Sequence, residues 1–300
     1  MSDFWTLITI MAIKKAIFCV AGYGTRFLPA TKAQPKEMLP IVDKPIIQYL
    51  VEESVAAGIE EIIFVTGRGK NTIENHFDKS FELENTLVEK GKHHLIEEIN
   101  HISDMANFAY VRQPIQKGDG HALLCAEPFI DPDESVLVIF PDYLMPLKSK
   151  TIAHMMDIYR EYREPVLALD TVDRDKVHLY GVADVSETNQ ENILKINKFI
   201  EKPKTEDAPS NLINIGYYIM TPAAIRTLKE TSSTHKDGEI RVADAITAMC
   251  NQNKDIYAYK SPVRGYDCGD KLGFLKATVD VALDREDLGG EFLDFLRTKI

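Results

Sequence analysis

The chain has 300 residues, 45% of them apolar and 27% charged, which is the balance of a globular protein. Its 35 Lys and Arg against 46 Asp and Glu give a formal charge of −11, which argues against binding nucleic acid or an anionic membrane. No apolar stretch approaches a membrane span, and the four cysteines form no CxxC pair, so we expect free thiols in a reducing cytoplasm.

Short β-rich runs alternate with helical patterns in the first half. Residues 1–10 are interpreted as an N-terminal extension rather than a signal peptide, because no basic residue precedes the apolar run. We predict strands over 15–20, 61–66, 108–112 and 135–140, and helices over 45–57, 71–77 and 121–127. This alternation indicates βαβ units, whose ligands lie beyond the carboxyl ends of the strands.

A charged, amphipathic stretch over 81–100 is predicted to be a helical excursion from the core, and the rest of the chain is richer in β-structure. The remaining predicted strands are 166–172, 181–185, 193–200, 212–220 and 256–260, and the helices are 222–231, 241–251, 271–284 and 291–299. The predicted fold is α/β, with a Rossmann-like mixed, mostly parallel sheet flanked by helices and a β-rich second half. The sequence contains no repeat or linker, so we expect one domain over 11–300.

The loop after Val20 combines bare backbone with cations. Glycines at 22 and 24 let backbone N–H groups approach an anion, and Arg26 and Lys36 add positive charge. The loop is not a Rossmann dinucleotide fingerprint, because Phe27 stands where the third glycine belongs, and no GK[ST] follows as in a Walker P-loop. Taken as a whole, the loop favours an anion site over a plain structural turn.

The opening segment reads AGYGTRFLPATKAQPKEMLPIVDKPIIQYLVEE, and it resembles the sugar-nucleotide pyrophosphorylases, whose signature is G-x-G-T-R followed by a Pro-Lys segment. Within them it is similar to the bacterial UTP–glucose-1-phosphate uridylyltransferases. Further matching segments occur in order to beyond Ala277, among them VRQPIQKGDGHALLCAEP, FPD, FIEKPK, DGEIRVADAI and YDCGDKLGFLKA. An ordered series over most of the chain is more specific than any single motif.

The resemblance implies a role for individual residues. The implied uracil contacts are Ala21, Gly22, Gln113 and Gly118, and the implied triphosphate contacts are Gly24, Thr25, Arg26 and Lys36. The implied Mg²⁺ ligands are Asp142 and, from the wider superfamily, Asp267. The implied sugar contacts are Gly181, Glu201 and Gly216, with Lys202 reaching the sugar phosphate. The resemblance also implies that Arg26, Lys36 and Lys202 are the catalytic cations. It divides the domain into a nucleotide-binding half over about 11–145, a sugar-binding half over about 146–270 and C-terminal helices over about 271–300.

Some positions depart from the family pattern. Tyr143 follows Asp142 where relatives often have a second acid, which leaves a carboxylate pair at that point in doubt. Asp119 replaces an apolar residue in G-x-G-H-A, and the sequence offers no explanation for it. Tyr217 stands where arginine is frequent, and we interpret it as altering effector or interface contacts rather than chemistry. Arg241 stands where glutamine is frequent.

The implied reaction makes UDP-glucose and pyrophosphate from UTP and glucose-1-phosphate by in-line attack of the sugar phosphate on the α-phosphorus. A phosphate monoester is mostly ionised at neutral pH, since its second pKa is about 6, so no general base is needed. The difficulty is electrostatic, because one anion attacks another, and we expect a small positive pocket with Mg²⁺ on Asp142.

Two alternatives stay open at this stage. A thymidylyltransferase would use the same Gln113, because uracil and thymine share the N3–H and O4 edge and differ by one methyl, worth only about 1–3 kcal/mol of discrimination. A non-catalytic paralogue could bind nucleotide sugars and regulate an active subunit. We also expect a homo-oligomer, dimer or tetramer, and apolar positions in 291–299 fit either a subunit interface or packing within the chain.

Overall fold

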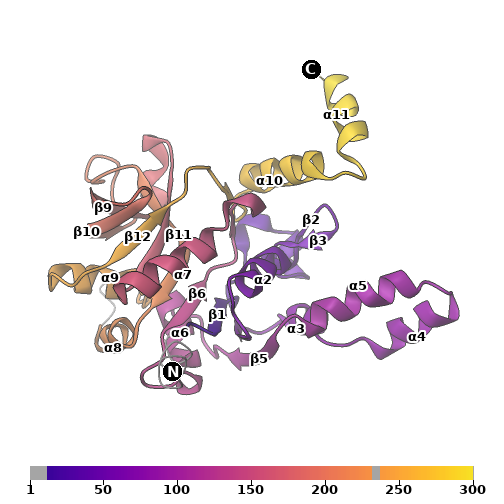
Figure 1. Ribbon diagram of the computed structural model, residues 1–300, viewed down its shortest axis with the longest axis horizontal. Coiled ribbons are helices and arrows are strands. Elements are labelled where there is room, and N and C mark those ends of the chain that lie inside the picture. The colour runs from indigo at the N-terminus through magenta and orange to yellow at the C-terminus, as the bar shows by residue number, and fades with distance from the viewer. Residues whose placement is uncertain (1–11, 232–236, 300) are drawn as a thin grey trace, which may run out of the picture.

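The computed structural model describes residues 12–231 and 237–299, so the extension expected over 1–10 lies outside the described residues (Figure 1). Among these residues one nine-stranded sheet has the order β5-β4-β1-β6-β11-β8-β12-β10-β9. Its strands are β1 (Lys15–Cys19), β4 (Glu61–Thr66), β5 (Asn107–Arg112), β6 (Val136–Ile139), β8 (Val166–Thr171), β9 (Gly181–Glu187), β10 (Ile193–Glu201), β11 (Leu212–Met220) and β12 (Tyr257–Lys260).

The direction of pairing changes along the sheet. Strands β5, β4, β1 and β6 are parallel, with Phe18 of β1 opposite Phe64 of β4 and Ile139 of β6. From β11 onward neighbours are antiparallel except for the parallel pair β8 and β12. The expected mixed α/β fold is confirmed, but parallel pairing dominates only the first half. The short connection from β9 to β10 suits a hairpin, whereas parallel neighbours need a crossover.

Helices cover both faces of the sheet. They are α2 (Ile46–Ala56), α3 (Asn71–Phe77), α4 (Phe81–Glu89), α5 (His93–Asp104), α6 (Asp119–Ala126), α7 (Thr151–Tyr162), α8 (Pro222–Glu230), α9 (Val242–Asn251), α10 (Lys271–Asp284) and α11 (Gly289–Arg297). Alternation in β1 divides the core, because Phe18 packs in the cluster with α2, α3 and α7, while Ile17 packs in the cluster with α6, α8 and α9. No described helix is both long enough and apolar enough to cross a bilayer.

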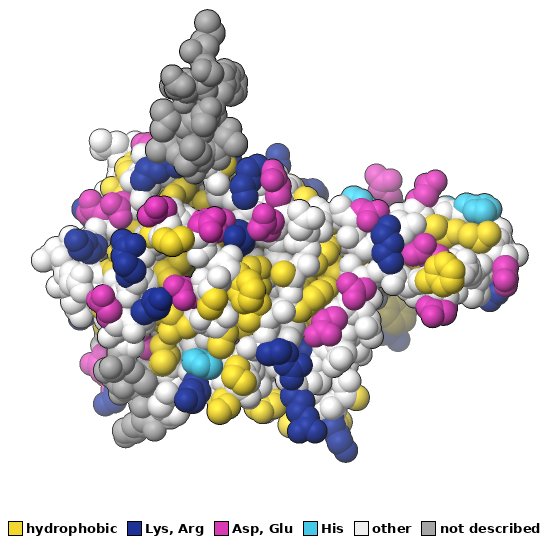
Figure 2. Space-filling model, turned by 90° about the horizontal axis from the view of Figure 1, so that it is seen from below, with side chains coloured by type: hydrophobic (Ala, Val, Ile, Leu, Met, Phe, Trp, Pro, Cys, Tyr) yellow, Lys and Arg dark blue, Asp and Glu magenta, His cyan; other side chains and the backbone are white. Residues whose placement is uncertain are grey.

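The segment predicted as a helical excursion forms two helices, α4 and α5, rather than one. They project from the body as a hairpin (Figures 1 and 2), and Phe81, Leu83 and Val88 expose apolar surface on α4. Gly91 has φ 65°, a left-handed conformation that favours glycine and ends α4 before α5 begins. Helix α7 was not predicted at all.

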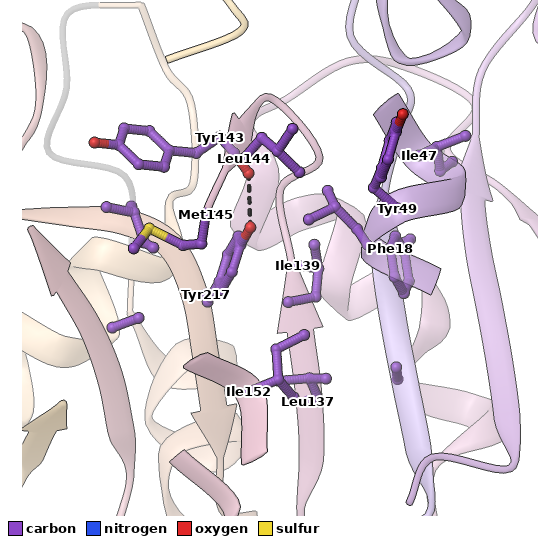
Figure 3. Close-up of a cluster of buried hydrophobic side chains, with 14 of the residues drawn as sticks. Phe18, Ile47, Tyr49, Leu137, Ile139, Tyr143, Leu144, Met145, Ile152 and Tyr217 are labelled. Carbon is purple, nitrogen blue, oxygen red and sulfur yellow. Dashed lines mark hydrogen bonds between the residues drawn. The ribbon is translucent and has the colours of Figure 1, made fainter. Parts of the chain in front are cut away.

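Tyr217 belongs to the core rather than to an effector or interface contact. It is fully buried in β11, and its hydroxyl donates to the backbone oxygen of Tyr143 at 2.6 Å (Figure 3). Tyr143 begins β7 (Tyr143–Leu144), which pairs antiparallel with β13 (Tyr266–Asp267). A further short pair, β2 (Pro40–Ile41) and β3 (Lys44–Pro45), comes after the opening loop.

Candidate active site

The candidate site is a cleft at the carboxyl ends of β1 and β6, with β9, β10 and β11 supplying the facing wall. It contains two adjoining cavities of about 280 and 190 Å³ that share Asp119, Phe140 and Asp142. We call the larger one the first-half cavity, and the predicted residues that line it include Ala21, Gly22, Lys36, Gln113 and Gly118. We call the smaller one the second-half cavity, and the predicted residues that line it include Arg26, Gly181, Glu201, Lys202, Gly216 and Asp267. Residues Gly24 and Thr25 lie in the same loop as Arg26 but line neither cavity.

The opening loop is fastened through its backbone. Gly24 has φ 65°, and a Cβ there would lie 3.1 Å from Cβ of Lys36 and 3.2 Å from Cγ2 of Thr31. The hydroxyl of Thr31 donates to the Gly24 carbonyl at 2.8 Å. Glycine therefore lets the loop fold back on itself and brings residue 36 beside residues 24–26.

Lys36 and Asp142 join the loop to the end of β6. Nζ of Lys36 lies 2.6 Å from Oδ2 of Asp142. Burial disfavours the charged lysine, but the charges of Asp142 and Glu37 outweigh it and raise the pKa of Lys36, whereas Arg26 opposes them. Glu37 is itself buried in an ion pair with Lys70 at 2.9 Å. Lys36 is therefore a permanent cation held at the strand end.

Arg26, Asp142 and Asp267 converge around Gly269. A Cβ on Gly269 would lie 3.0 Å from Oδ1 of Asp267, 3.3 Å from Oδ2 of Asp142 and 3.5 Å from Nη1 of Arg26. Oδ2 of Asp267 accepts from the hydroxyl of Tyr180 at 2.6 Å, and Oδ1 accepts from the Gly269 N–H at 2.9 Å. Burial raises the pKa of Asp267, and the nearby Asp142 charge adds to this, so the two carboxylates sense one another.

A buried network keeps the two carboxylates together. The β7–β13 register places Tyr143 opposite Asp267. The Tyr143 hydroxyl donates to Oδ2 of Asp170 at 2.7 Å, and the same oxygen accepts from the Gly265 N–H at 2.7 Å. Tyr143 is therefore not a lost ligand but an anchor for the strand end that carries Asp142, and Asp170 ties that strand end to the segment leading to Asp267.

The two carboxylates form a donor set that suits magnesium. Mg²⁺ prefers oxygen ligands and usually binds one or two carboxylates together with waters and substrate phosphates. Asp142 and Asp267 supply two carboxylates, and Oδ1 of Asp142 has no hydrogen-bond partner among the described residues. Within the described ranges, no group of three or more His, Cys, Asp or Glu side chains could hold a metal ion. The residues fit an ion that completes its coordination with substrate, not a closed protein site.

The second-half cavity is acidic, contrary to the expected positive pocket. Its charged lining consists of the cations Arg26 and Lys202 and the acids Asp119, Asp142, Glu201 and Asp267. Lys36 adds a cation from the adjoining cavity. The three predicted cations do converge on one cleft, but they do not outnumber its carboxylates, because this wall is built from strand ends that carry acids.

Gly181 makes room for the carboxylate of Glu201. Gly181 pairs with Glu201 across β9 and β10, and a Cβ on Gly181 would lie 2.4 Å from Cζ of Phe199 and 2.9 Å from Oε2 of Glu201. Burial raises the pKa of Glu201, while Lys202 and Arg241 lower it. The carboxylate is thus held against the cavity wall with most of its surface covered.

Lys202 and Gly216 show backbone conformations that are uncommon in strands. Lys202 has φ 46°, a left-handed conformation that costs a non-glycine residue about 1 kcal/mol or more, and its N–H donates to the Tyr180 carbonyl at 3.0 Å. Gly216 has φ 85° at an irregularity of β11, where a Cβ would lie 3.0 Å from Cβ of Phe140. Both conformations occur on the cavity wall.

Gln113 is held in a fixed orientation by its amide nitrogen. Nε2 of Gln113 donates to the Gly118 carbonyl at 2.9 Å and lies 3.0 Å from Nδ1 of His121. Because the Gly118 oxygen only accepts, the amide nitrogen must face it, and Nδ1 of His121 is then the acceptor of the second N–H. Burial and the Lys117 charge lower the pKa of His121, which agrees with a neutral ring. Oε1 of Gln113 is left for a ligand.

Several cleft residues were not predicted from the sequence. Asn214 is buried, and its Nδ2 has no partner among the described residues, while its Oδ1 accepts from the Gly216 N–H at 2.6 Å. Tyr180 and Tyr218 line the same cavity. No local signal in the sequence shows which strand residues face the cleft once β11 has an irregularity at Gly216.

The sequence pattern of the nucleotidyl transferase family matches residues 15–283. The chain belongs to this family. Two similar relatives are UTP–glucose-1-phosphate uridylyltransferase 2 of Staphylococcus saprophyticus, 45% identical over 95% of this chain and 97% of the relative, and the UTP–glucose-1-phosphate uridylyltransferase of Staphylococcus epidermidis, 45% identical over 95% and 98%. The resemblance found in the sequence is therefore confirmed.

Solved nucleotidyl transferase structures share the fold. A UDP-glucose pyrophosphorylase complexed with UDP-glucose is 40% identical with a TM-score of 0.81, covering 91% of this chain and 100% of that one. A UTP-bound UGPase from Acinetobacter baumannii is 38% identical with a TM-score of 0.85, covering 95% and 98%. The architecture described above is therefore that of this family.

Proposed function

We propose that the chain is a UTP–glucose-1-phosphate uridylyltransferase, which forms UDP-glucose and pyrophosphate. The observation that carries the proposal is the convergence of Arg26, the Lys36–Asp142 pair and Lys202 on one cleft. Relatives 45% identical over 95% of the chain bear that name, and similar solved structures hold UTP or UDP-glucose.

The nucleophile needs no general base. An oxygen of the sugar phosphate attacks the α-phosphorus of UTP, the bond to the β-phosphate oxygen breaks, and pyrophosphate leaves. Because the monoester is mostly ionised at neutral pH, the protein has only to align the two phosphates and offset their repulsion. In this proposal Arg26, which lines the second-half cavity, and Lys36, which lines the first-half cavity, bind the triphosphate, and Lys202 binds the sugar phosphate.

The acidity of the second-half cavity explains why the proposed reaction would need magnesium. Two unit charges 4 Å apart interact by about 1 kcal/mol in water but about 4 kcal/mol at an effective dielectric of 20, so uncompensated carboxylates would repel phosphate strongly. Asp142 and Asp267 would hold Mg²⁺, which neutralises their charge and that of the phosphates. The Lys36 ammonium, already bonded to Asp142, then lies beside the same phosphates.

Base recognition rests on one side-chain acceptor and backbone donors. Oε1 of Gln113 accepts from N3–H of the base, and the glycine backbone around residues 22 and 118 approaches the ring without a Cβ in the way. This arrangement fits uracil and thymine alike. The thymidylyltransferase reaction is therefore the rival for the same site, and it is separated by comparing UTP with dTTP.

The sugar side offers complementary hydrogen-bonding groups. Glu201 accepts hydrogen bonds from sugar hydroxyls, and the buried Nδ2 of Asn214 can donate to a hydroxyl oxygen. A buried donor without a partner costs free energy, so a ligand that satisfies it gains affinity.

Assembly, organisation and location belong to the same proposal. Helices α10 and α11 project from the body of the molecule (Figure 1). Exposed Leu272 and Leu275 of α10 and Leu293 and Phe295 of α11 give them apolar surface suited to a second copy, which supports a homo-oligomer. The sheet that continues across both halves supports one domain over 11–300. The free cysteines and the charge of −11 support a cytoplasmic protein whose partners are small substrates, not nucleic acid or membrane.

The deciding assay measures pyrophosphate release from purified protein with Mg²⁺, UTP and glucose-1-phosphate. We expect release with UTP and much less with dTTP. Faster release with dTTP would make the protein a thymidylyltransferase. Absence of release with either nucleotide at millimolar concentrations, together with measurable UDP-glucose binding, would make it a non-catalytic binding protein.

A further inference from the structure

Asp119 stands where the two cavities meet. It begins α6 directly after Gly118, and it lines both the first-half cavity with Gln113 and the second-half cavity with Glu201. The other charged residue shared by the two cavities is Asp142, which lies on the phosphate side. Asp119 therefore lies on the wall shared by the proposed nucleotide and sugar sites, apart from the proposed metal site.

One carboxylate oxygen of Asp119 has a structural task. Oδ1 accepts from the N–H of Val242, the first residue of α9, at 2.7 Å. The surrounding backbone is paired as well, since Ile240 N–H donates to the Lys117 carbonyl at 2.8 Å and Gly120 N–H donates to the Ile240 carbonyl at 2.9 Å. This pairing fixes the direction of the carboxylate. Oδ2 has no hydrogen-bond partner among the described residues.

The charge of Asp119 is more than this cap needs. A neutral Asn or Ser accepts a helix N–H nearly as well as Asp does. The carboxylate instead lies close to Glu201 and Glu239, and burial together with their charges raises the pKa of Asp119 to about 7, against the effects of the Val242 hydrogen bond and Arg241. An additional acid in a cleft that must accept phosphates is unfavourable unless the free oxygen gains a donor on binding.

We propose that Asp119 determines substrate specificity by accepting, through its free carboxylate oxygen, a hydrogen bond from a substrate hydroxyl at the junction of the two cavities. The inference rests on the proposed function, because the hydroxyl belongs either to the ribose of the nucleotide or to the sugar. Both are hydroxyl donors, and a carboxylate oxygen is an acceptor for such a donor. A site built to bind a hydroxyl strongly rejects the analogue that lacks it.

The test compares the wild type with Asp119→Asn, which keeps an oxygen for Val242 N–H but replaces the free acceptor with a donor. Asp119→Ser is the second variant, and Asp133→Asn, an exposed acid, controls for loss of one charge. The nucleotide arm compares UTP with 2′-deoxy-UTP and 3′-deoxy-UTP. The sugar arm compares glucose-1-phosphate with its 2-, 3-, 4- and 6-deoxy analogues.

We expect the wild type and Asp133→Asn to discriminate against one of these deoxy analogues by about 10- to 100-fold in kcat/KM. In Asp119→Asn that ratio should shrink to within about threefold, mainly through KM for the natural substrate. The analogue whose discrimination is lost in Asp119→Asn identifies the hydroxyl that Asp119 binds.

Retention of every ratio in both variants would overturn the inference and leave Asp119 as a helix cap. The same ratios are measured as dissociation constants by calorimetry with UTP and with UDP-glucose and their deoxy analogues. If the wild type shows no turnover, the proposed function fails while the binding ratios still decide the role of Asp119.

Discussion

The two walls of the cleft differ in what they present to a ligand. The first-half wall, at the ends of parallel strands, presents glycine backbone and one amide oxygen, and its lysine is fastened to Asp142. The second-half wall, built mainly from antiparallel strands, presents the carboxylates of Glu201 and Asp267 and the amide of Asn214. The first-half wall thus offers a ligand mainly backbone groups, and the second-half wall offers it mainly side-chain groups.

The glycines of the two walls differ in the atoms that surround them. A Cβ on Gly118 would lie 2.3 Å from the backbone oxygen of Ile240, whereas one on Gly181 would lie 2.4 Å from the ring edge of Phe199. A side chain can shift, but the backbone at Ile240, just before α9, cannot move without breaking its pairing with residues 117–121. If the proposed base and sugar sites are right, base recognition at Gly118 is tied to folding, and sugar recognition at Gly181 can change with less effect on the fold.

The largest expected effect lies where the two walls meet. Asp142→Asn removes a proposed Mg²⁺ ligand and the ionic partner of Lys36, so kcat should fall by about 10²- to 10³-fold with the thermal melting curve nearly unchanged. The measurement is pyrophosphate release across a Mg²⁺ titration. Asp157→Asn, on the exposed side of α7, is the control. Wild-type turnover in Asp142→Asn would remove this residue from the mechanism.

A pair of glycine substitutions tests the comparison directly. Gly118→Ala should lower the free energy of unfolding by about 3 kcal/mol, because φ is 96° and the new Cβ meets backbone. Gly181→Ala should cost about 1 kcal/mol, because the ring of Phe199 can shift, and should raise KM for the sugar phosphate. Urea denaturation measures both, with Gly290→Ala, which has open space, as control. Equal losses for 118 and 181 would break the distinction between the walls.

The charge on the sugar side should affect one substrate only. In Lys202→Ala, KM for glucose-1-phosphate should rise by about 10- to 100-fold, because a charged hydrogen bond to phosphate is lost, while KM for UTP stays within about twofold. Initial-rate kinetics with each substrate varied in turn provide the measurement. Lys198→Ala, an exposed lysine of β10 just before Lys202, should match the wild type. An equal rise in both KM values would place Lys202 on the triphosphate instead.

The smallest expected effect is a pH-dependent gain in stability at the shared wall. Burial, with Glu201 and Glu239 nearby and Arg241 opposing them, raises the pKa of Asp119 from 3.8 to about 7. Between these two pKa values the folded state holds a proton that the unfolded state releases. Ionising Asp119 therefore lowers the free energy of unfolding, and this loss is absent below about pH 4, grows as the pH rises and is complete above about pH 7. Asp119→Asn should therefore gain stability over the wild type by about 1–3 kcal/mol between pH 5 and pH 8. A stability difference that stays constant across these pH values in urea denaturation would contradict the pKa shift.

Much of the fold could be predicted because local pattern and tertiary structure agree. Strands such as β1 and β4 are short apolar runs, and each was predicted within a residue of its ends. Helix α7 escaped because its N-terminus has no local signal: Lys150 precedes it in a left-handed conformation, and the Ile152 N–H is capped at 3.0 Å by Glu53 of α2. A cap supplied from about a hundred residues away leaves no trace in the nearby sequence.

The candidate site was predictable where a motif comes directly after a strand. The positions of Arg26, Lys36 and Asp142 at strand ends are expected from the βαβ pattern, and the structure places them together. Three acids of the second-half cavity, Asp142, Glu201 and Asp267, were predicted one by one as site residues, whereas the fourth, Asp119, was not. The expectation of a positive pocket was wrong because it counted the cations without counting these acids together. The catalytic, binding and metal roles stay predictions for the assays above.

The pairing of residues 117–121 with 240–242 also sets the order in which the protein can be completed during synthesis. Strand β6 can pair with β11 only after residue 220 has left the ribosome. The carboxylate of Asp119 can accept from the Val242 N–H only after residue 242 has been made. A nascent chain that stops short of α9 therefore lacks the backbone partners of residues 117–121, and we expect nucleotide to stabilise it less because the proposed base site is incomplete. We therefore expect the parallel half to fold during synthesis with little stabilisation by nucleotide.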